Sequence, residues 1–215
     1  MFFFGKRKEP EAKAVLLDQA MAAQLRAHFE KILHPVELIA SLDGKPKSGE
    51  MRAFLDELGV LSDKINVTFK PEADARTPSF SVARKGEDAR IRFAGLPLGH
   101  ELTSLVLAIL HASGHPPKAE QALIDRIRGI NGDCRFETYI TLSCHNCPDV
   151  VQAFNLMAAI NPRIQHTMID GKLFMDEIDR YKIDAVPTIF LHGQPFARGK
   201  KSLQEFVDMV ASAPR

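Results

Sequence analysis

The sequence predicts an α/β protein built from two successive units, each with a central mixed β-sheet flanked by helices. Three observations support this prediction. Helical and strand-like hydrophobic patterns alternate along the chain, their order in the first half returns in the second half, and two pairs of landmarks repeat at similar spacing. With 215 residues, of which 45% are hydrophobic and 26% charged, the chain can form one large or two small packed domains.

In the first half, apolar residues at helical spacing between Glu11 and Leu33 predict a helix that ends at His34-Pro35. Amphipathic spacing predicts two further helices, from Glu50 to Leu61 and from about Gly99 to Ser113. Short apolar or alternating runs predict strands at Val36–Leu42, Ile65–Phe69, Pro78–Val82 and Ala89–Phe93.

A stiff break at His115-Pro116-Pro117 is where we expect the first unit to end. The expected organisation is a mobile extension over residues 1–17, a first unit over 18–116 and a second over 117–215. The second unit should contain helices at Ala119–Ile130, Asn146–Ile160, Leu173–Tyr181 and from Ser202, with strands at Phe136–Leu142, Ile164–Ile169, Thr188–Leu191 and Pro195–Arg198.

Two landmarks favour an internal duplication. Thr77-Pro78 opens the predicted hairpin of the first half as Val186-Pro187 opens that of the second, 187 − 78 = 109 residues later. Leu42 and Leu142, each at the end of an early strand, are 142 − 42 = 100 residues apart. Chance similarity between two α/β units is the alternative. A βαβ unit, a hairpin and a closing helix are typical of the thioredoxin-like fold, so we expect two such folds in tandem.

Charge and composition exclude several classes of function. Lys and Arg number 28 and Asp and Glu 27, so the basic excess that favours nucleic acids or acidic membranes is missing. No apolar run approaches the ~20 residues of a membrane-spanning helix. The N-terminal residues place their apolar side chains before the charges, the reverse of a secretory signal, so we expect a cytoplasmic protein. Three cysteines are too few for a disulfide-stapled secreted scaffold.

The motif Ser143-Cys144-His145-Asn146-Cys147-Pro148 lies where a predicted strand turns into a predicted helix. In that context a C-x-x-C motif is typical of a redox-active dithiol. The two side chains lie on one face of the first helical turn, close enough to form a disulfide, and the helix N-terminus stabilises a thiolate. We expect Cys144 to be the nucleophile and Cys147 to resolve the mixed disulfide.

Other interpretations of the cysteines are a structural zinc site or inert core thiols. Zinc usually needs a second ligand pair, and Cys134 with His145 or His166 lacks a recognisable metal spacing, so we expect no metal. For Cys134 we expect a buried, unreactive thiol, with a regulatory thiol as the alternative. His145 either helps the thiolate electrostatically or tunes partner fit.

Around the dithiol, we expect Pro187 to be cis and to expose the backbone of Val186 to an incoming peptide, the alternative being an ordinary trans proline. The segment Arg198-Gly199-Lys200-Lys201 is interpreted as a solvated loop, or as positive charge beside the thiolate. In the first half, Gly44 and Lys47 occupy the positions matching the cysteines, so this half cannot cycle a disulfide.

Long runs of this chain resemble the N-terminal domain of the F component of bacterial alkyl hydroperoxide reductase, from about Leu25 to Val210. The runs that carry the resemblance are Pro35–Ala40, Arg92–Gly95, Pro97–Ala108 and Ser143–Ala153. The resemblance implies tandem thioredoxin-like folds with one active pair that relays electrons from a flavin module to the disulfide of a peroxiredoxin. It also implies that Glu101 lies across a groove from the dithiol and handles a proton or tunes a pKa. From the sequence alone, Glu101 could equally serve only the helix dipole.

The family continues into flavin and nicotinamide domains, whereas this sequence has no G-x-G-x-x-G fingerprint. We therefore expect no FAD or NAD site in this chain and no cofactor, only the redox-active disulfide. The expected electron donor is a separate flavoprotein disulfide reductase. The expected acceptor is a peroxiredoxin. The alternatives are a general thioredoxin- or glutaredoxin-like reductase of protein disulfides and a non-catalytic adaptor that docks a peroxiredoxin. The predicted site comprises Cys144, Cys147 and Glu101, with His145, Val186 and Pro187 contacting the partner.

Overall fold

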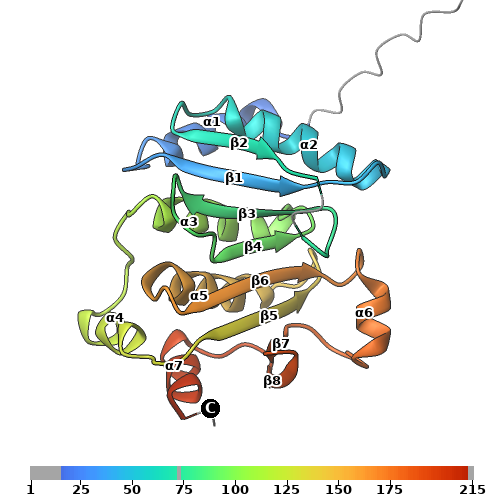
Figure 1. Cartoon of the computed structure of the whole chain (residues 1–215). Coiled ribbons are helices and arrows are strands. Elements are labelled where there is room, and N and C mark those ends of the chain that lie inside the picture. Colours follow the sequence, from blue (N-terminus) through green and yellow to red (C-terminus); the bar gives the residue numbers. More distant parts are fainter. Residues whose placement is uncertain (1–15, 72–73, 213–215) are drawn as a thin grey trace, which may run out of the picture.

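The computed structural model describes residues 16–71 and 74–212, and its strands form one continuous mixed sheet in the order β2-β1-β3-β4-β6-β5-β7-β8 (Figure 1). The strands are β1 (Val36–Ser41), β2 (Ile65–Phe69), β3 (Ser79–Arg84), β4 (Ile91–Ala94), β5 (Cys134–Ile140), β6 (Ile164–Asp170), β7 (Thr188–Leu191) and β8 (Gln194–Arg198). The helices are α1 (Gln19–Phe29), α2 (Pro46–Gly59), the 3₁₀ turn η1 (Gly99–Glu101), α3 (Leu102–Ala112), α4 (Gln121–Arg128), α5 (Cys147–Ile160), α6 (Met175–Arg180) and α7 (Leu203–Ser212).

The two halves of the sheet have the same topology. In the first half β1 pairs in parallel with β2 across the crossover helix α2, and then antiparallel with β3, which pairs antiparallel with β4. In the second half β5 pairs with β6 across α5, then with β7, and β7 pairs with β8, in the same senses. The tandem α/β fold predicted from the sequence is therefore confirmed.

Strands β4 and β6 join the halves by a parallel ladder that runs from the pair Ile91 and His166 to the pair Ala94 and Ile169. The two units thus share one sheet instead of packing as separate globules. A consequence is that the loops at the carboxyl ends of β4, β5 and β6 lie along one edge of the sheet. The first half can therefore contribute side chains to a site in the second half.

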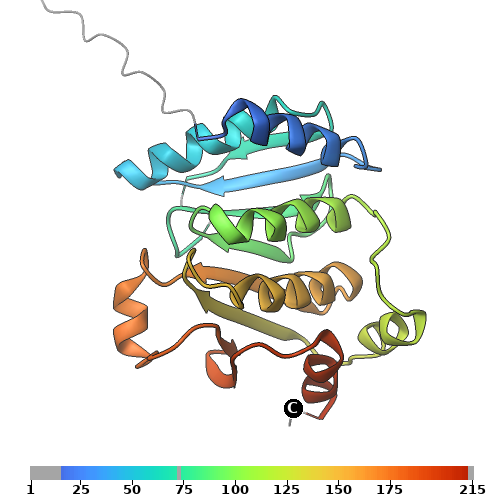
Figure 2. The ribbon, with the colours of Figure 1, turned by 180° about the vertical axis from the view of Figure 1, so that it is seen from behind.

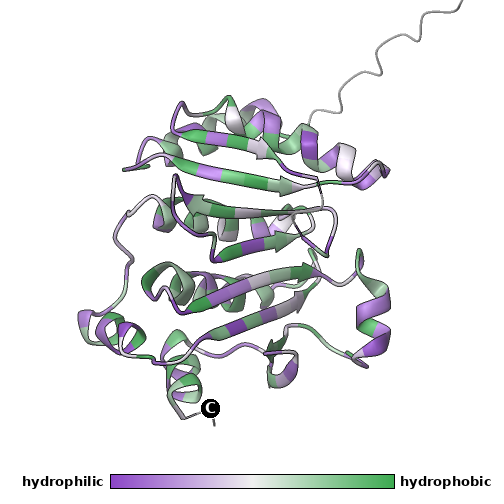
Figure 3. Cartoon of the chain, in the orientation of Figure 1, coloured by the Kyte–Doolittle hydropathy of each residue, from purple (hydrophilic) through white to green (hydrophobic). Residues whose placement is uncertain are grey.

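Helices α1, α3 and α5 lie side by side across one face of the sheet (Figure 2). Beneath them the alternate residues Val36, Leu38 and Ala40 of β1 are fully buried. Helix α6 packs on the opposite face, over a smaller cluster formed by Ala94, Tyr139, Ile169 and Phe190. The central strands carry both apolar and polar residues, whereas α6 exposes mostly hydrophilic residues (Figure 3). None of the helices in the described part of the chain combines the length and apolar character that crossing a bilayer requires.

Several element boundaries differ from the sequence-based expectation. Helix α1 begins at Gln19 because the Asp18 carboxylate caps it, accepting a hydrogen bond of 2.8 Å from the Met21 amide. Helix α2 begins at Pro46 and not at Glu50, because a proline fits the first helical turn. Leu16 and Leu17 were expected in the mobile extension, but their amides donate to the Glu57 carboxylate at 2.8–3.2 Å. The rest of that expected extension lies outside the described residues.

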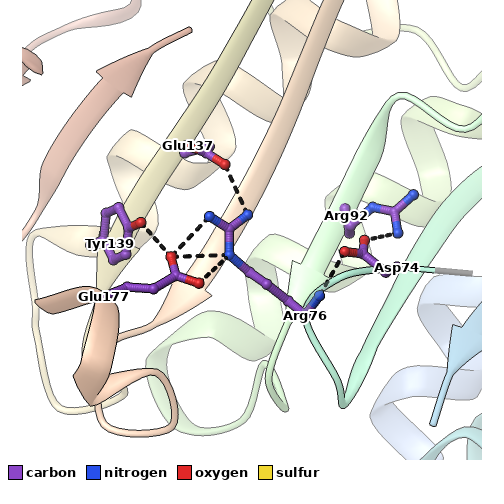
Figure 4. A network of polar contacts seen from close by, with 6 residues as sticks. All are labelled: Asp74, Arg76, Arg92, Glu137, Tyr139 and Glu177. Atoms are coloured by element: carbon purple, nitrogen blue, oxygen red, sulfur yellow. Dashed lines mark hydrogen bonds and ion pairs between the residues drawn. The ribbon is translucent and has the colours of Figure 1, made fainter. Parts of the chain in front are cut away.

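Arg76 ties the two halves together on the face that carries α6 (Figure 4). Its guanidinium donates to the Glu177 carboxylate on α6 at 2.8 Å and to Glu137 of β5 at 2.8 Å. The Tyr139 hydroxyl also donates to Glu177, at 2.6 Å. Because these groups are largely buried, each charge is satisfied only while the first-half segment around Arg76 stays against the second half.

Candidate active site

Cys144 and Cys147 form a disulfide between the end of β5 and the start of α5, with their Cα atoms 5.5 Å apart. Cys147 is the first residue of α5 and is fully buried. Cys144 lies one turn earlier in the loop and is partly exposed, with its amide donating to the Thr141 carbonyl at 3.0 Å. Of the two cysteines, only Cys144 is therefore partly exposed at the surface.

The N-terminus of α5 favours negative charge at these sulfurs once the disulfide is reduced. The helix has 14 residues, and the Asn146 side chain makes no capping hydrogen bond, so the first amides stay available. Asp149 in the first turn would oppose a thiolate, but its carboxylate is ion-paired with Lys200. Lys200 and Arg198 belong to the segment expected to be a solvated basic loop. Lys200 compensates the Asp149 carboxylate beside the dithiol. Arg198 forms an ion pair with Asp184 at 2.7 Å.

Val186 and Pro187 lie directly against the disulfide. Cys144 Sγ is 4.0 Å from the Val186 carbonyl oxygen, and the peptide bond between Val186 and Pro187 is cis. The matching bond in the first half, between Thr77 and Pro78, is cis as well. The partly exposed Cys144 sulfur and the backbone of Val186 therefore form one continuous surface at the start of β7.

The first half supplies a wall of the site through a ring contact that the sequence did not reveal. The His100 ring contacts the His145 ring, with centroids 4.4 Å apart, and both side chains are exposed. Gly99 has φ +58°, and a Cβ there would lie 3.3 Å from the Leu142 carbonyl oxygen, so a glycine allows the close approach. The signal in the sequence was the Gly95–Glu101 run, but nothing in that run indicates its neighbour across the sheet.

Glu101 is fully buried at the junction of η1, α3 and α5. Ser104 Oγ donates to Glu101 Oε2 at 2.6 Å, and Gln152 of α5 donates to Ser104 Oγ at 3.4 Å. Glu101 Oε1 has no hydrogen-bond partner among the described residues. Burial raises the pKa of Glu101 to about 7, opposed by the Ser104 hydrogen bond and assisted by the charge of Asp149. The carboxyl can therefore gain and lose a proton near neutral pH.

The other chemically interesting residues do not join this site as metal ligands. Among residues 16–71 and 74–212, no group of three or more His, Cys, Asp or Glu side chains is arranged to hold a metal ion. Both ring nitrogens of the buried His166 are engaged, Nδ1 with Asn155 at 2.7 Å and Nε2 with Thr138 at 2.8 Å. Burial lowers the pKa of His166 to about 3, so this ring is neutral.

Two further expectations concern positions away from the dithiol. Cys134 was expected to be buried, but it is partly exposed, because β5 begins at this residue on the rim of the sheet. In the first half, Gly44 lies in the loop after β1 and Lys47 in the first turn of α2. No disulfide-forming pair stands at that place, because the sequence has cysteines only at 134, 144 and 147.

Comparison with known proteins gives three consistent results. The thioredoxin domain family matches residues 135–211. The F component of alkyl hydroperoxide reductase from Escherichia coli (strain K12) is 52% identical over 197 residues, and that from Pseudomonas putida is 48% identical over 196; each match covers 91% of this chain. The chain spans only 37% of the length of these two relatives. The crystal structure of the NTD_N/C domain of alkylhydroperoxide reductase AhpF from Enterococcus faecalis (V583) superposes with a TM-score of 0.85 and 30% identity, covering 90% of this chain and 99% of that one.

Proposed function

We propose that the chain relays electrons from a flavoprotein disulfide reductase to a peroxiredoxin disulfide. The proposal starts from the family of the chain, which belongs to the N-terminal domains of the F component of alkyl hydroperoxide reductase. The chain is a disulfide oxidoreductase with a thioredoxin-like fold. The donor, the acceptor and the roles of individual residues are the proposal. The observation that carries it is the disulfide at the start of α5, with Cys144 accessible and Cys147 buried.

In the proposed cycle the reduced chain reacts in two exchanges. The Cys144 thiolate attacks one sulfur of the peroxiredoxin disulfide, that bond breaks, and the second peroxiredoxin sulfur leaves as a thiolate. Cys147 then loses its proton and attacks Cys144 Sγ, which releases the first peroxiredoxin sulfur and re-forms the Cys144–Cys147 disulfide. Two electrons pass to the peroxiredoxin, whose thiolates take up protons. The dithiol of the flavoprotein reverses the exchange.

Two features around the disulfide support a protein as the substrate. The carbonyl of Val186 lies beside Cys144 Sγ, so an extended segment of the partner can pair with the backbone at Val186 and Pro187 while its disulfide meets Cys144. The exposed rings of His145 and His100 lie on the same surface. We assign Val186, Pro187 and His145 to partner binding on these grounds.

Glu101 is proposed to handle the proton that Cys147 gives up. An acid or base works best when its pKa is near the operating pH, and burial brings that of Glu101 to about 7. Glu101 connects through Ser104 to Gln152, which lies on the same helix as Cys147. The unpaired Oε1 atom leaves the carboxyl free to bond a further group.

The experiment that tests this function mixes the reduced chain with an oxidised peroxiredoxin and, separately, with insulin as a general disulfide substrate. We expect the peroxiredoxin to oxidise the chain much faster, and turnover to continue when a flavoprotein disulfide reductase and NADH are added. Equal rates with both substrates would assign a general reductase. If Cys144→Ser still supported turnover, the chain would be a docking adaptor and not a carrier.

A further inference from the structure

A groove of 680 Å³ is lined by residues of α1, α3 and α5, the helices that lie side by side on one face of the sheet. All three helices supply its floor, which is apolar and includes Leu25, Val106, Leu110, Ala153 and Leu156. One end lies at Leu102 and Asp149 and the other at His111 and Lys118. Neither redox cysteine lines it. A volume of this size lies in the range of small-molecule sites, about 300–1,000 Å³.

The shape of the groove suits a single extended chain. Each floor residue is less than a tenth exposed, and the partly exposed side chains of Met21, Leu102, Leu107 and Leu203 form apolar walls beside the floor. Along α3 the groove extends from Leu102 to His111, or about 14 Å at a rise of 1.5 Å per residue, and it continues past the end of the helix to Lys118.

One end of the groove carries unpaired positive charge. The amides of Leu33 and His34 donate to Ser113 at 3.2 and 3.1 Å, so the segment after α1 abuts the end of α3. Lys31 and Lys118 both line the groove at this end. No carboxylate lines this end, and neither lysine forms an ion pair with another described residue. At the opposite end Lys200 is paired with Asp149, and the charge of Lys201 acts on the nearby Glu205 carboxylate of α7. Since the whole chain has a net charge of only +1, this positive end is a local feature.

We propose that this groove binds a long-chain fatty acid, with the alkyl chain along the apolar floor and the carboxylate between Lys31 and Lys118. An apolar strip that ends in two lysines without acidic partners is complementary to a single alkyl chain with an anionic head. The proposal goes beyond the electron relay, and it needs neither redox cysteine.

The test is calorimetric titration of the unmodified chain with palmitate below its aggregation concentration. We expect saturable binding of one palmitate per chain, and no comparable binding of hexadecyltrimethylammonium, which has the same alkyl chain and the opposite charge. Because the chain contains no tryptophan, Leu107→Trp on the partly exposed wall of the groove provides an optical signal, and Val60→Trp, outside the groove, serves as its control. Palmitate should change the fluorescence of the first variant only.

Matched charge variants locate the head group. Lys31→Glu with Lys118→Glu should weaken palmitate binding at least about tenfold, while Lys70→Glu with Lys85→Glu, two exposed lysines outside the groove, should change it by less than about twofold. Cys144→Ser should bind palmitate as the unmodified chain does, which separates this proposal from the relay. Absence of palmitate binding, equal loss in both lysine pairs, or binding only of a glutamate-rich amphipathic peptide would overturn it.

Discussion

The imidazole ring of His100 contacts the ring of His145, although the two residues belong to different halves of the chain. His145 lies between the two cysteines of the disulfide, so the half without redox cysteines forms part of the surface around the disulfide. The shared sheet makes this contact possible, because the ladder between β4 and β6 aligns the loop after β4 with the loop after β5.

Removal of the His100 ring should slow the reaction with a protein partner. We expect His100→Ala to lower the rate constant for oxidation by a peroxiredoxin about fivefold, since an aromatic contact contributes about 1 kcal/mol, and His100→Phe to keep most of the rate. Stopped-flow measurement of thiol loss checks this. A small aromatic disulfide needs no docking surface and should react equally with all three proteins, so a parallel slowing there would contradict a role in the partner surface.

Glu101 should make the stability of the chain fall as the pH rises. The pKa of Glu101 in the folded state, about 7, lies above the ordinary value of 4.5. Between pH 4.5 and pH 7, the folded state therefore keeps a proton that the unfolded state has lost. Stability from this group is fully present below pH 4.5 and is lost as the pH rises through 7, by at most about 3 kcal/mol. Urea unfolding of the unmodified chain and of Glu101→Gln from pH 4.5 to 8 measures the difference. An identical pH dependence in both would contradict the assignment.

The hydroxyl of Ser104 should hold the Glu101 pKa down. Its 2.6 Å hydrogen bond to Oε2 favours the carboxylate, so Ser104→Ala should move the Glu101 pKa further above its usual range. The pH midpoint of the resolving step, measured by single-turnover kinetics, should therefore rise in Ser104→Ala. Ser104→Thr keeps the hydroxyl and should stay close to the unmodified chain. A midpoint that stays constant or falls in the alanine variant would show that Ser104 does not act on Glu101.

Arg76 should contribute strongly to the stability of the joined halves. Without its guanidinium, Glu137 and Glu177 remain largely buried without their cation, so Arg76→Ala should lower the free energy of unfolding by about 3 kcal/mol (Figure 4). Arg128→Ala breaks an exposed pair with Asp125 and should cost less than about 1 kcal/mol. Urea denaturation gives both values. Equal losses in the two variants would contradict a joining role for Arg76.

The elements of the fold and the cysteine pair could be predicted from the sequence because both depend on local patterns. Apolar periodicity indicated the strands and helices, and the C-x-x-C motif at a strand-to-helix turn indicated the redox pair. The start of α1 was missed because the apolar periodicity extends to residues before Asp18, the residue whose side chain caps the helix. The contact of His100 with His145 and the pairing of β4 with β6 depend on tertiary structure, and one sequence carries no local signal for them.

The burial of Glu101 shows the same limit at the site. A glutamate in a first helical turn is usually exposed. From the sequence alone, Glu101 could have served only to stabilise the helix dipole. The structure instead buries the carboxyl against α5, where Ser104 and Gln152 connect it to the helix that carries Cys147. The residues could therefore be identified from the sequence, but the raised pKa of Glu101 arises only from packing.

Trapping of the mixed disulfide tests the central assignment most directly. In reduced Cys147→Ser the first exchange can proceed but the resolving attack cannot, so oxidised peroxiredoxin should accumulate as a covalent adduct. Peptide mass spectrometry should locate that adduct at Cys144, and reduced Cys144→Ser should form none. An adduct at Cys134, or equal trapping by the two serine variants, would contradict the assignment of Cys144 as the attacking sulfur.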